Sequence, residues 1–346
     1  MTMLLSMLAD DPARTPAATD IISARVSVAL CTYNGARFLD PQLDSFATQT
    51  RLPDELVVCD DGSTDDTVAI LERFKNRAPF PVRIFSNETR LGSTKNFEKA
   101  IGLCTGDLIA TSDQDDVWLP EKLALSQAAL ARDPRCGLVF SDADVVDDDL
   151  RSRGHRMWDA IHFGRLARRR VRIGRGFEVL LRQWVVTGAT MMFRADYRPC
   201  ILPIPDNWVH DGWIAFIIGA MARVSSVECS TLKYRQHAAQ QIGGKKLGWK
   251  ERYELARAMG PPYFRLAHER FVLAQERLHV FAPRVRDQRF LAMIDRKVEH
   301  QRRRLAIAES RSRWQRVRWA LGEFLCGGYQ RFSAPACPHF IKDLIL

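Results

Sequence analysis

Aspartates that could bind a divalent cation lie close together near residue 115. Asp113 and Asp115 are separated by Gln114, and Asp116 follows directly. Carboxylate oxygens are ligands that Mg²⁺ and Mn²⁺ prefer, and one or two of them can hold such an ion together with substrate phosphates. An ion at this point could neutralise charge on a departing phosphate group. Because a short Asp-x-Asp sequence is common, its meaning depends on the elements that position it.

Other polar residues also follow short apolar runs. Thr32 and Tyr33 come after the first run, and Asp60 and Asp61 come after the second. Capping of a following helix would explain Asp65. It would not explain Asp60 and Asp61, which lie directly at the end of an apolar run. These positions are therefore candidates for binding a ligand.

The elements that must position these residues are strands and helices in alternation. Apolar runs without polar alternation are typical of strands that are buried on both faces of a parallel sheet. Such runs occupy residues 26–31, 56–59, 82–85, 108–111 and 137–141, and helix-period segments occupy about 37–49, 65–76, 94–103 and 120–131. The pattern predicts an α/β fold, a Rossmann-like, mixed and mostly parallel sheet flanked by helices. Ligands bind such sheets at the carboxyl ends of the strands, which is where the aspartates fall.

Further candidates follow later in the chain. A strand is expected at 187–193 and begins with Thr187 and Gly188, and a helix is expected at 211–221 and begins with Asp211. Strands near 223–227 and 231–235 lead to Arg235 and His237. Each of the later polar residues has a structural alternative. Asp211 could be a helix N-cap, Arg235 could pair with an acid, and His237 could be an ordinary packing histidine.

Two segments are strongly basic. Residues 151–176 contain nine arginines and one acid, Asp159, and we expect a mobile loop that is either solvated or faces a phosphate or acceptor. Residues 245–346 hold 22 Lys/Arg and 10 Asp/Glu, a balance of +12 within a total of +10, so the rest of the chain is slightly acidic. The tail is expected to be helical, and its charge could form a solvated face or contact an anionic surface.

Composition limits the class of protein. With 346 residues and 46% hydrophobic content, the chain can form one large domain and an appendage. We expect an N-terminal extension over 1–24, flexible and without an export signal, a main domain over 25–244 and a basic helical region over 245–346. Eight cysteines without metal-binding spacing suggest free thiols in a reducing compartment. No apolar stretch approaches the length of a membrane span, so a cytoplasmic protein, peripheral at the inner membrane face at most, is expected.

Three segments together resemble a known family. Residues 26–35, 56–65 and 112–122 read VSVALCTYNG, LVVCDDGSTD and SDQDDVWLPEK. In this order they are similar to the serial motifs of the inverting family 2 glycosyltransferases, which have the GT-A fold, and the resemblance extends over about 25–244. It implies an enzyme that transfers a sugar from a nucleotide-diphosphate donor to an acceptor hydroxyl in a single displacement.

The resemblance also implies roles for the candidate residues. The nucleotide would contact Thr32, Tyr33, Asp60, Asp61, Lys95, Asn96 and Asp113, although Lys95 stands where the family often has arginine. Asp115 would bind Mn²⁺ or Mg²⁺ directly, aided by Asp113 and His237. Asp211 would be the general base that accepts the proton of the acceptor hydroxyl. Arg235, Thr187 and Gly188 would contact the diphosphate or the acceptor.

Within the family, 112–122 and the C-terminal residues are similar to bacterial enzymes of surface polysaccharide synthesis, including rhamnosyltransferases. This implies dTDP-rhamnose or a UDP-hexose as donor and a saccharide or lipid-linked saccharide as acceptor. The basic tail, with Trp314, Trp319, Phe324 and Tyr329, would then contact the membrane that carries the acceptor.

Three other functions compete with this interpretation. A nucleotidyltransferase-like or other nucleotide-binding enzyme would carry a glycine-rich loop after its first strand, whereas only Gly35 follows this one. A nucleic-acid binder would not carry an acidic cluster in its main domain. An inactive relative of the transferases would be expected to lack some of Asp113, Asp115 and Asp211.

Overall fold

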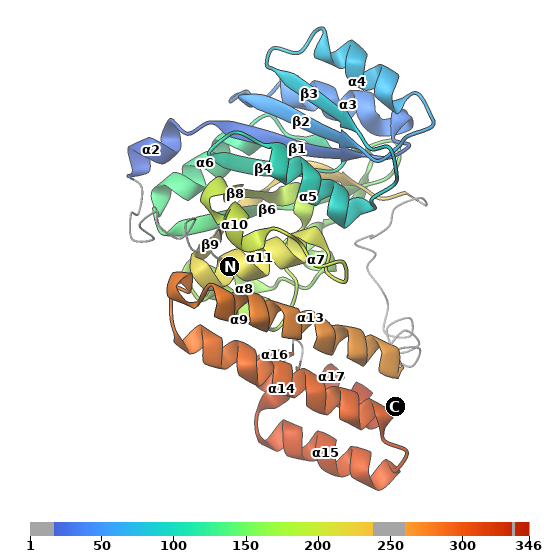
Figure 1. Cartoon of the computed structure of the whole chain (residues 1–346), viewed down its shortest axis with the longest axis vertical. Coiled ribbons are helices and arrows are strands. Elements are labelled where there is room, and N and C mark those ends of the chain that lie inside the picture. Colours follow the sequence, from blue (N-terminus) through green and yellow to red (C-terminus); the bar gives the residue numbers. More distant parts are fainter. Residues whose placement is uncertain (1–16, 238–259, 334–335, 346) are drawn as a thin grey trace.

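A single mixed sheet forms the centre of the main domain. The computed structural model describes residues 17–237, 260–333 and 336–345, and Figure 1 shows the sheet at one end of the molecule and the C-terminal helices at the other. The strands are β1 (Val26–Thr32), β2 (Glu55–Asp60), β3 (Val82–Ser86), β4 (Leu108–Ser112), β5 (Val117–Trp118), β6 (Cys136–Val146), β7 (Ser152–Arg156), β8 (Met191–Arg194) and β9 (Arg223–Arg235). Their order across the sheet is β3-β2-β1-β4-β8-β6-β9-β5, and β7 pairs with β6.

The pairing confirms the predicted mixed α/β sheet. β3, β2, β1 and β4 are parallel neighbours, and β8 joins them antiparallel to β4. β6 and β9 are parallel to each other, while β5 pairs antiparallel with β9. Because β1, β2 and β4 run the same way, the residues that follow them gather at one edge of the sheet.

Helices cover both faces of the sheet. One face packs on α3 (Ala36–Ala47), α4 (Thr67–Lys75) and α6 (Lys122–Arg132) through a core that includes Leu43, Phe74 and Leu130. The other face packs on α5 (Ser93–Leu103), α9 (Gly176–Leu180) and α11 (His210–Met221). Every residue of β1 and β2 is buried, which explains why their sequences lack polar alternation.

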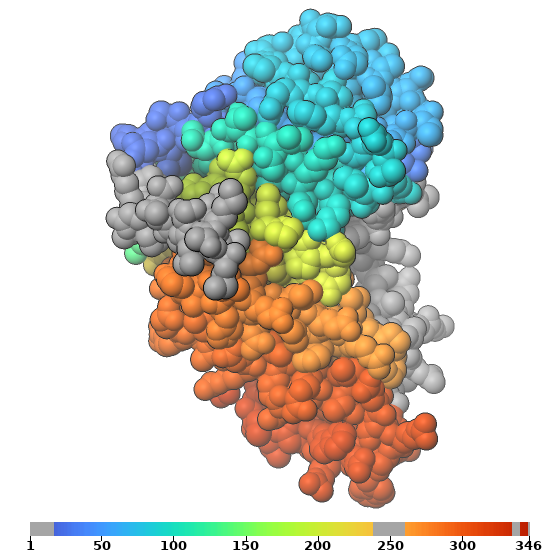
Figure 2. All heavy atoms as spheres, in the orientation of Figure 1, coloured from blue at the N-terminus to red at the C-terminus, as the bar shows by residue number. Residues whose placement is uncertain are grey.

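The C-terminal helices extend the second of these cores. They are α13 (Pro261–Val280), α14 (Arg289–Glu309), α15 (Arg313–Leu325), α16 (Gly328–Phe332) and α17 (Ala336–Ile345). Phe271, Ala274 and Leu278 of α13 belong to the same buried cluster as α11. In the space-filling view the orange helices lie directly against the main domain (Figure 2). No helix in the described part of the chain is long and apolar enough to cross a membrane.

The basic segment 151–176 is not the loop expected from the sequence. It contains β7, α7 (Met157–Ala160) and α8 (Arg165–Arg172). Met157, Trp158 and Phe163 are buried and anchor it to the sheet. The arginines misled the prediction because they outnumber these apolar residues, although the apolar residues decide the packing.

Smaller differences concern the ends of elements. The two strands expected between 223 and 235 form one strand, β9, with irregular register to β6. The strand expected at 187–193 begins as a short 3-10 turn, Gly188–Thr190, before β8. In the expected flexible extension, α2 (Ala18–Ile22) is helical with Ile21 buried, and residues 1–16 lie outside the described residues.

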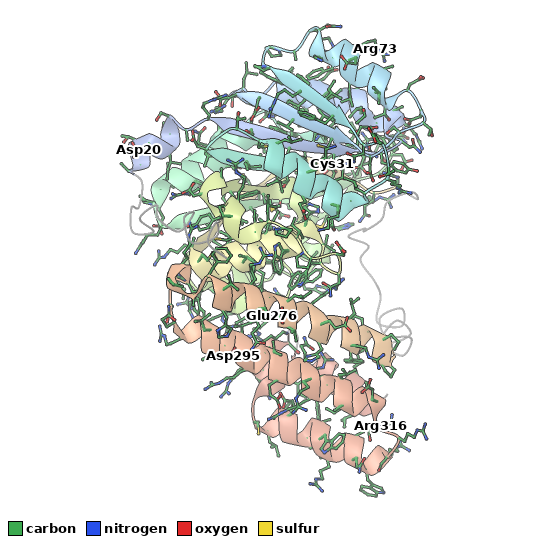
Figure 3. All side chains as sticks on the ribbon, in the orientation of Figure 1. Asp20, Cys31, Arg73, Glu276, Asp295 and Arg316 are labelled. Atoms are coloured by element: carbon green, nitrogen blue, oxygen red, sulfur yellow. The ribbon has the colours of Figure 1, made fainter. Side chains whose placement is uncertain are left out.

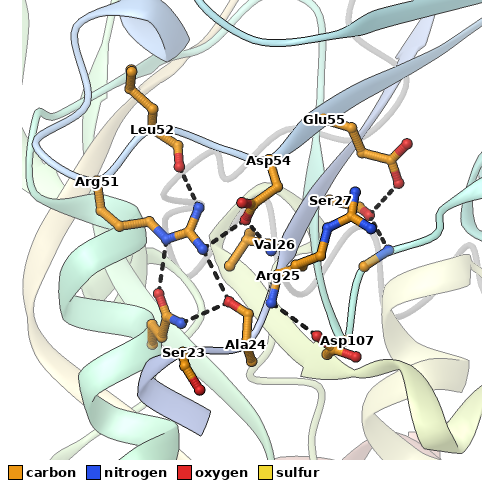
Figure 4. Close-up of polar contacts among 12 residues, drawn as sticks. Ser23, Ala24, Arg25, Val26, Ser27, Arg51, Leu52, Asp54, Glu55 and Asp107 are labelled. Carbon is orange, nitrogen blue, oxygen red and sulfur yellow. Dashed lines mark hydrogen bonds and ion pairs between the residues drawn. The ribbon is translucent and has the colours of Figure 1, made fainter. Parts of the chain in front are cut away.

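Charged residues at the amino ends of the parallel strands are paired (Figure 4). The main-chain N–H of Arg25 donates to Asp107 Oδ2 at 2.9 Å, and Val26 N–H donates to Asp54 Oδ2 at 2.7 Å. Arg51 forms an ion pair with Asp54 at 2.7 Å. These contacts tie the start of β1 to the segments that precede β2 and β4.

Candidate functional site

A cavity of about 390 Å³ lies at the carboxyl ends of β1, β2 and β4. Ten of the residues predicted for the site line it: Thr32, Tyr33, Asp61, Asn96, Asp113, Asp115, Thr187, Gly188, Asp211 and His237. Asp60, Lys95 and Arg235 are not among its lining residues. Cys31, which also lines the cavity, is labelled at the end of β1 in Figure 3.

Gln114 joins the aspartate segment to the turn after β1. Its side-chain oxygen accepts a hydrogen bond from Tyr33 N–H at 2.8 Å, and its Nε2 donates to the Tyr33 carbonyl at 3.0 Å. A Cβ on Gly35 would lie 2.2 Å from this oxygen, so a side chain there would displace the glutamine. The middle residue of the Asp-x-Asp segment therefore fixes the position of Asp113 and Asp115 relative to the turn.

Asp60 and Asp61 have different roles. Asp60 is buried and accepts hydrogen bonds from Thr32 Oγ1 at 2.8 Å and from Ser63 N–H at 2.9 Å, so it holds the loop beneath the cavity. Asp61 lines the cavity and accepts from the N–H groups of Leu91 and Gly92 at 2.7 and 2.8 Å.

Arg90 was missed by sequence reasoning. It lines the cavity, and its guanidinium lies 3.8 Å from the centre of the Tyr33 ring. It also lies 3.9 Å from Asp61. No motif marks it, because it belongs to an irregular segment between β3 and α5.

Asn96 supports Asp61 through another side chain. Asn87 Nδ2 donates to Asp61 Oδ1 and to Asn96 Oδ1, each at 2.9 Å. Lys95, the next residue, points elsewhere. Its ammonium donates to Glu98 at 2.9 Å and to the Ile204 carbonyl at 2.6 Å. The structure therefore brings Asn96 to the cavity and leaves Lys95 outside it, because neighbouring residues on a helix face different directions.

The aspartates that follow β4 are buried close together, so their negative charges repel one another. Burial, together with the negative charges of Asp115 and Asp211, raises the pKa of Asp113 to about 8. Burial also raises the pKa of Asp116 well above its usual range, as do Asp115 and Asp113. Asp116 Oδ2 is buried without a hydrogen-bond partner among the described residues. A cation near these carboxylates would relieve the repulsion.

His237 contacts the second aspartate of the segment. Its Nε2 lies 2.7 Å from Asp115 Oδ2, and its ring lies 4.7 Å from that of Phe38. Arg235 donates from Nε to the main-chain carbonyl of Asp115 at 2.7 Å, and its own N–H donates to Asp116 Oδ1 at 3.1 Å. The end of β9 therefore braces the aspartate segment.

The residues near Asp115 could hold a divalent cation whose remaining ligands would come from the substrate. No three His, Cys, Asp or Glu side chains converge into a full metal site within the described ranges. Mg²⁺ typically uses only one or two carboxylates of the protein and takes its remaining ligands from phosphate and water. Asp115, with Asp113 and His237 beside it in the cavity, matches that requirement in number and chemical type.

Asp211 lies in the first turn of α11 and faces the cavity. Its Oδ2 accepts a hydrogen bond from Gly188 N–H at 3.0 Å. The N-cap of the helix is Val209, so Asp211 is not the cap residue. The neighbouring His210 is buried, stacks on Phe97 at 3.8 Å, and has no hydrogen-bond partner for either ring nitrogen among the described residues. Burial lowers the pKa of His210, which favours the neutral ring.

Lys122 connects the aspartate segment to the turn that holds Asp211. It is fully buried at the start of α6, and its ammonium donates to the Ala189 carbonyl at 2.8 Å. Ala189 follows Gly188, whose N–H bonds Asp211. Burial lowers the pKa of Lys122 to about 7 against the attraction of Asp116. A buried lysine is rare, yet from the sequence this one resembles an ordinary helix residue.

Comparison with known proteins places part of the chain in the family that its sequence motifs resemble. Residues 27–197 match the model of Glycosyl transferase family 2. An uncharacterised glycosyltransferase of Nostoc sp. is 35% identical over 123 residues, which is 35% of this chain and 34% of that protein. The matched region thus spans about a third of that relative.

Two solved structures share the fold. TarS 1-349 of S. aureus in complex with UDP-GlcNAc has a TM-score of 0.56 and 17% identity, covering 92% of this chain and 81% of that one. The mannosyltransferase PcManGT of Pyrobaculum calidifontis in complex with GDP-Man and Mn²⁺ has a TM-score of 0.51 and 18% identity, covering 99% of this chain and 92% of that one. By its motifs and this match, the region 27–197 is a family 2 glycosyltransferase domain, and its sheet has the GT-A-like fold that these solved structures share.

Proposed function

We propose that the chain is an inverting glycosyltransferase that uses a nucleotide-diphosphate sugar and a divalent cation. The observation that carries the proposal is one cavity that contains both the acidic segment with His237 and the separate carboxylate of Asp211. The two fold neighbours hold UDP-GlcNAc and GDP-Man, which supports a nucleotide-sugar donor.

The donor nucleotide would bind in the turn after β1, against Tyr33, Arg90 and Asp61. These three lie together in the cavity and offer an aromatic ring, a cation and a carboxylate. Asp113, Asp115 and His237 would hold Mn²⁺ or Mg²⁺ beside the diphosphate, and the ion would supply positive charge where the leaving group becomes negative. Arg235, bonded to the aspartate segment, would keep that segment in place.

Asp211 would accept the proton of the acceptor hydroxyl as that oxygen attacks the anomeric carbon. The attack forms the new glycosidic bond and breaks the bond to the diphosphate, and a single displacement inverts the anomeric centre. Two main-chain N–H groups orient this carboxylate in the cavity wall, Gly188 N–H at 3.0 Å from Oδ2 and Gly212 N–H at 2.6 Å from Oδ1. A carboxylate held within reach of the hydroxyl is the main requirement for this general-base step.

The sugar and its acceptor are proposed on resemblance. We propose dTDP-rhamnose or a UDP-hexose as donor and a saccharide or lipid-linked saccharide of bacterial surface polysaccharide assembly as acceptor. Thr187 would face that acceptor, since it lines the cavity next to Gly188.

Thermal unfolding with UDP-, dTDP- and GDP-sugars, with and without Mn²⁺, tests the proposal. One donor should raise the unfolding temperature, and the rise should depend on the metal. Asp115→Ala should remove the metal-dependent rise. Asp211→Asn should keep it while turnover falls about 10²–10⁴-fold. Asp206→Asn, an exposed carboxylate outside the cavity, is the matched control. Absence of a response to every donor with metal present would contradict the proposal.

We also propose that α15 contacts an anionic membrane, and a surface on this helix supports that proposal. Trp314, Leu321 and Leu325 are 85%, 44% and 81% exposed, at a spacing that places them on one side of the helix. Arg313 and Arg318 are also exposed. Basic residues beside exposed apolar side chains suit anionic lipid headgroups. Of the other aromatic residues expected there, Tyr329 is buried and cannot take part.

Point variants test this contact better than truncation. Removal of everything after residue 245 would expose the core that α13 shares with α11. We expect Trp314→Ala combined with Leu325→Ser to reduce flotation with vesicles that contain phosphatidylglycerol. Leu166→Ser, another exposed apolar residue at 77%, is the control. Equal flotation of all three proteins would contradict membrane contact through α15.

A further inference from the structure

The cavity has a second wall that carries no carboxylate. We give this name to the uncharged lining residues Met157, Ile161, Trp184, Val186 and Val209, of which Trp184 lies against the turn that contains Asp211. Sites for uncharged parts of a ligand combine apolar and aromatic surface with a few polar groups. This wall therefore suits a different part of the substrate from the nucleotide and its phosphates.

Trp184 is the large exposed side chain of this wall. It is 40% exposed, whereas Trp158, Trp208 and Trp213 are at most 3% exposed. One exposed apolar residue is not unusual by itself. The position of this one is informative, because its indole packs on the same helical turn as Asp211. A Cβ on Gly212, the next residue, would lie 3.6 Å from the Trp184 ring.

The indole packs against Trp208 and the guanidinium of Arg270, whose Cζ lies 5.3 Å from the centre of the Trp184 ring. Trp208 stacks on it with ring centres 5.8 Å apart and an angle of 19°. Trp208 is fixed in turn by a hydrogen bond from its Nε1 to the Arg270 carbonyl at 2.9 Å and by the edge of Phe271 at 5.8 Å. Arg270 and Phe271 belong to α13, so the C-terminal region supports this wall. A ring that is already fixed loses little conformational freedom when it binds a ligand.

We propose that Trp184 is the platform on which the acceptor saccharide stacks. A pyranose has an apolar face of C–H groups and an edge of hydroxyl groups. Stacking of the C–H face on the indole would direct hydroxyls toward the neighbouring Asp211, which must deprotonate one of them. The inference rests on the proposed glycosyltransferase function, and it names the acceptor side of that site.

The residues on the other side of the cavity explain why we place the acceptor, and not the donor, on Trp184. Tyr33 and Arg90 already offer a stacked surface beside the turn after β1, where a nucleotide would lie. Asp113, Asp115 and His237 suit a metal and a diphosphate. Trp184 contacts instead the turn that holds the candidate base. The base must contact the acceptor, so the indole beside it is placed for the same molecule.

Ligand-observed NMR on the full chain tests the inference. The probes are methyl α-L-rhamnopyranoside, methyl β-D-glucopyranoside and methyl N-acetyl-β-D-glucosaminide, each with and without UDP and Mn²⁺. We expect at least one to bind the wild type with saturation transferred to its ring C–H protons. Trp184→Ala should weaken that binding about tenfold or more, in line with aromatic stacking on other planar ligands.

Two variants and two further measurements complete the design. Trp184→Phe should keep most of the affinity, and Trp319→Ala, 42% exposed on α15, should leave it unchanged. Stabilisation by nucleotide sugar and slow hydrolysis of the donor by water should be the same in Trp184→Ala as in the wild type. These readouts separate an acceptor platform from a general loss of structure.

Three outcomes overturn the inference. They are unchanged glycoside affinity in a folded Trp184→Ala protein, loss of nucleotide-sugar stabilisation in that variant, and no glycoside binding by the wild type under any condition. Failure of the proposed function gives a different pattern. The wild type would then show no stabilisation by any nucleotide sugar, while glycoside binding would still depend on Trp184.

Discussion

The two ends of the parallel strands contain the same types of residue in opposite electrostatic states. At the amino ends, Glu55 accepts hydrogen bonds from Ser27 Oγ and Thr105 N–H, each at 2.6 Å, and lies 3.1 Å from Arg83. Burial would raise the pKa of Glu55, but these bonds and Arg83 together lower it. At the carboxyl ends, the pKa of Asp113 is instead raised to about 8.

The difference separates a structural role from a functional one. A carboxylate that the protein neutralises by itself has no charge left for a ligand. A group of carboxylates that the protein leaves unbalanced is stabilised when it takes up a proton or when a cation binds beside it. The amino ends therefore hold the sheet together, and the carboxyl ends carry the unbalanced charge that the proposed metal ion would offset.

Loss of Lys122 should have the largest effect. At the amino ends Arg51 pairs with a carboxylate, whereas Lys122 donates to a carbonyl of the turn that positions Asp211. Lys122→Met should reduce kcat about 100-fold, which is about 2.7 kcal/mol in activation free energy, with donor affinity unchanged. Steady-state kinetics measures kcat and the KM for the donor separately. An unchanged kcat would mean that the lysine only fills space.

Replacement of Glu55 should have the second-largest effect, and it should change the stability of the protein but not its activity. Glu55→Gln should lower the free energy of unfolding by about 2 kcal/mol at pH 7, because its charge-assisted bonds are lost. The stabilisation from a lowered pKa is present above the ordinary pKa and is lost as pH falls through the folded value. The difference between the proteins should therefore shrink toward pH 3 in urea titrations. Equal stabilities at pH 7 would contradict this role, and Glu72→Gln at the surface is the control.

Asp113 should show the opposite dependence on pH. A raised pKa gives stability that is present below the ordinary pKa and is lost as pH rises through the folded value, here about 8. With a chelator present, the wild type should lose stability between about pH 4 and pH 8. Asp113→Asn should flatten this slope and be more stable at pH 8 by about 1.4 kcal/mol or more, the value of one pKa unit. A parallel slope in both proteins would exclude repulsion at Asp113.

Lys95 should give the smallest effect. Its ion pairs with Glu98 and Asp206 are partly exposed and lie outside the cavity. Lys95→Ala should change the free energy of unfolding by less than about 1 kcal/mol. It should also leave stabilisation by the nucleotide sugar unchanged. A clear loss of that stabilisation would support the role that resemblance gives to Lys95.

The amino-acid pattern was enough to predict the order of strands and helices in the first half of the chain and the edge of the sheet at which the ligand would bind. Strands buried on both faces need uninterrupted apolar runs, and parallel strands gather the residues that follow them. The positions of Asp61, Asp113, Asp115 and Asp211 followed from those two requirements and from the family resemblance. The ordered segment 151–176 did not follow, because a few buried residues outweigh many charged ones.

Which residues share the cavity could not be predicted in this way, because it depends on how distant segments pack. Lys95 and Asn96 are adjacent in sequence, yet only Asn96 lines the cavity. Arg90 and Trp184 carry no local signal, and Lys122 ends a recognisable motif without a predicted role, since the importance of all three comes from contacts with segments far away in the chain. The charge state of Asp113 likewise depends on this packing: burial and the approach of Asp211, 98 positions later in the numbering, raise its pKa. Such effects depend on distance in space, which the spacing of residues along the chain does not contain.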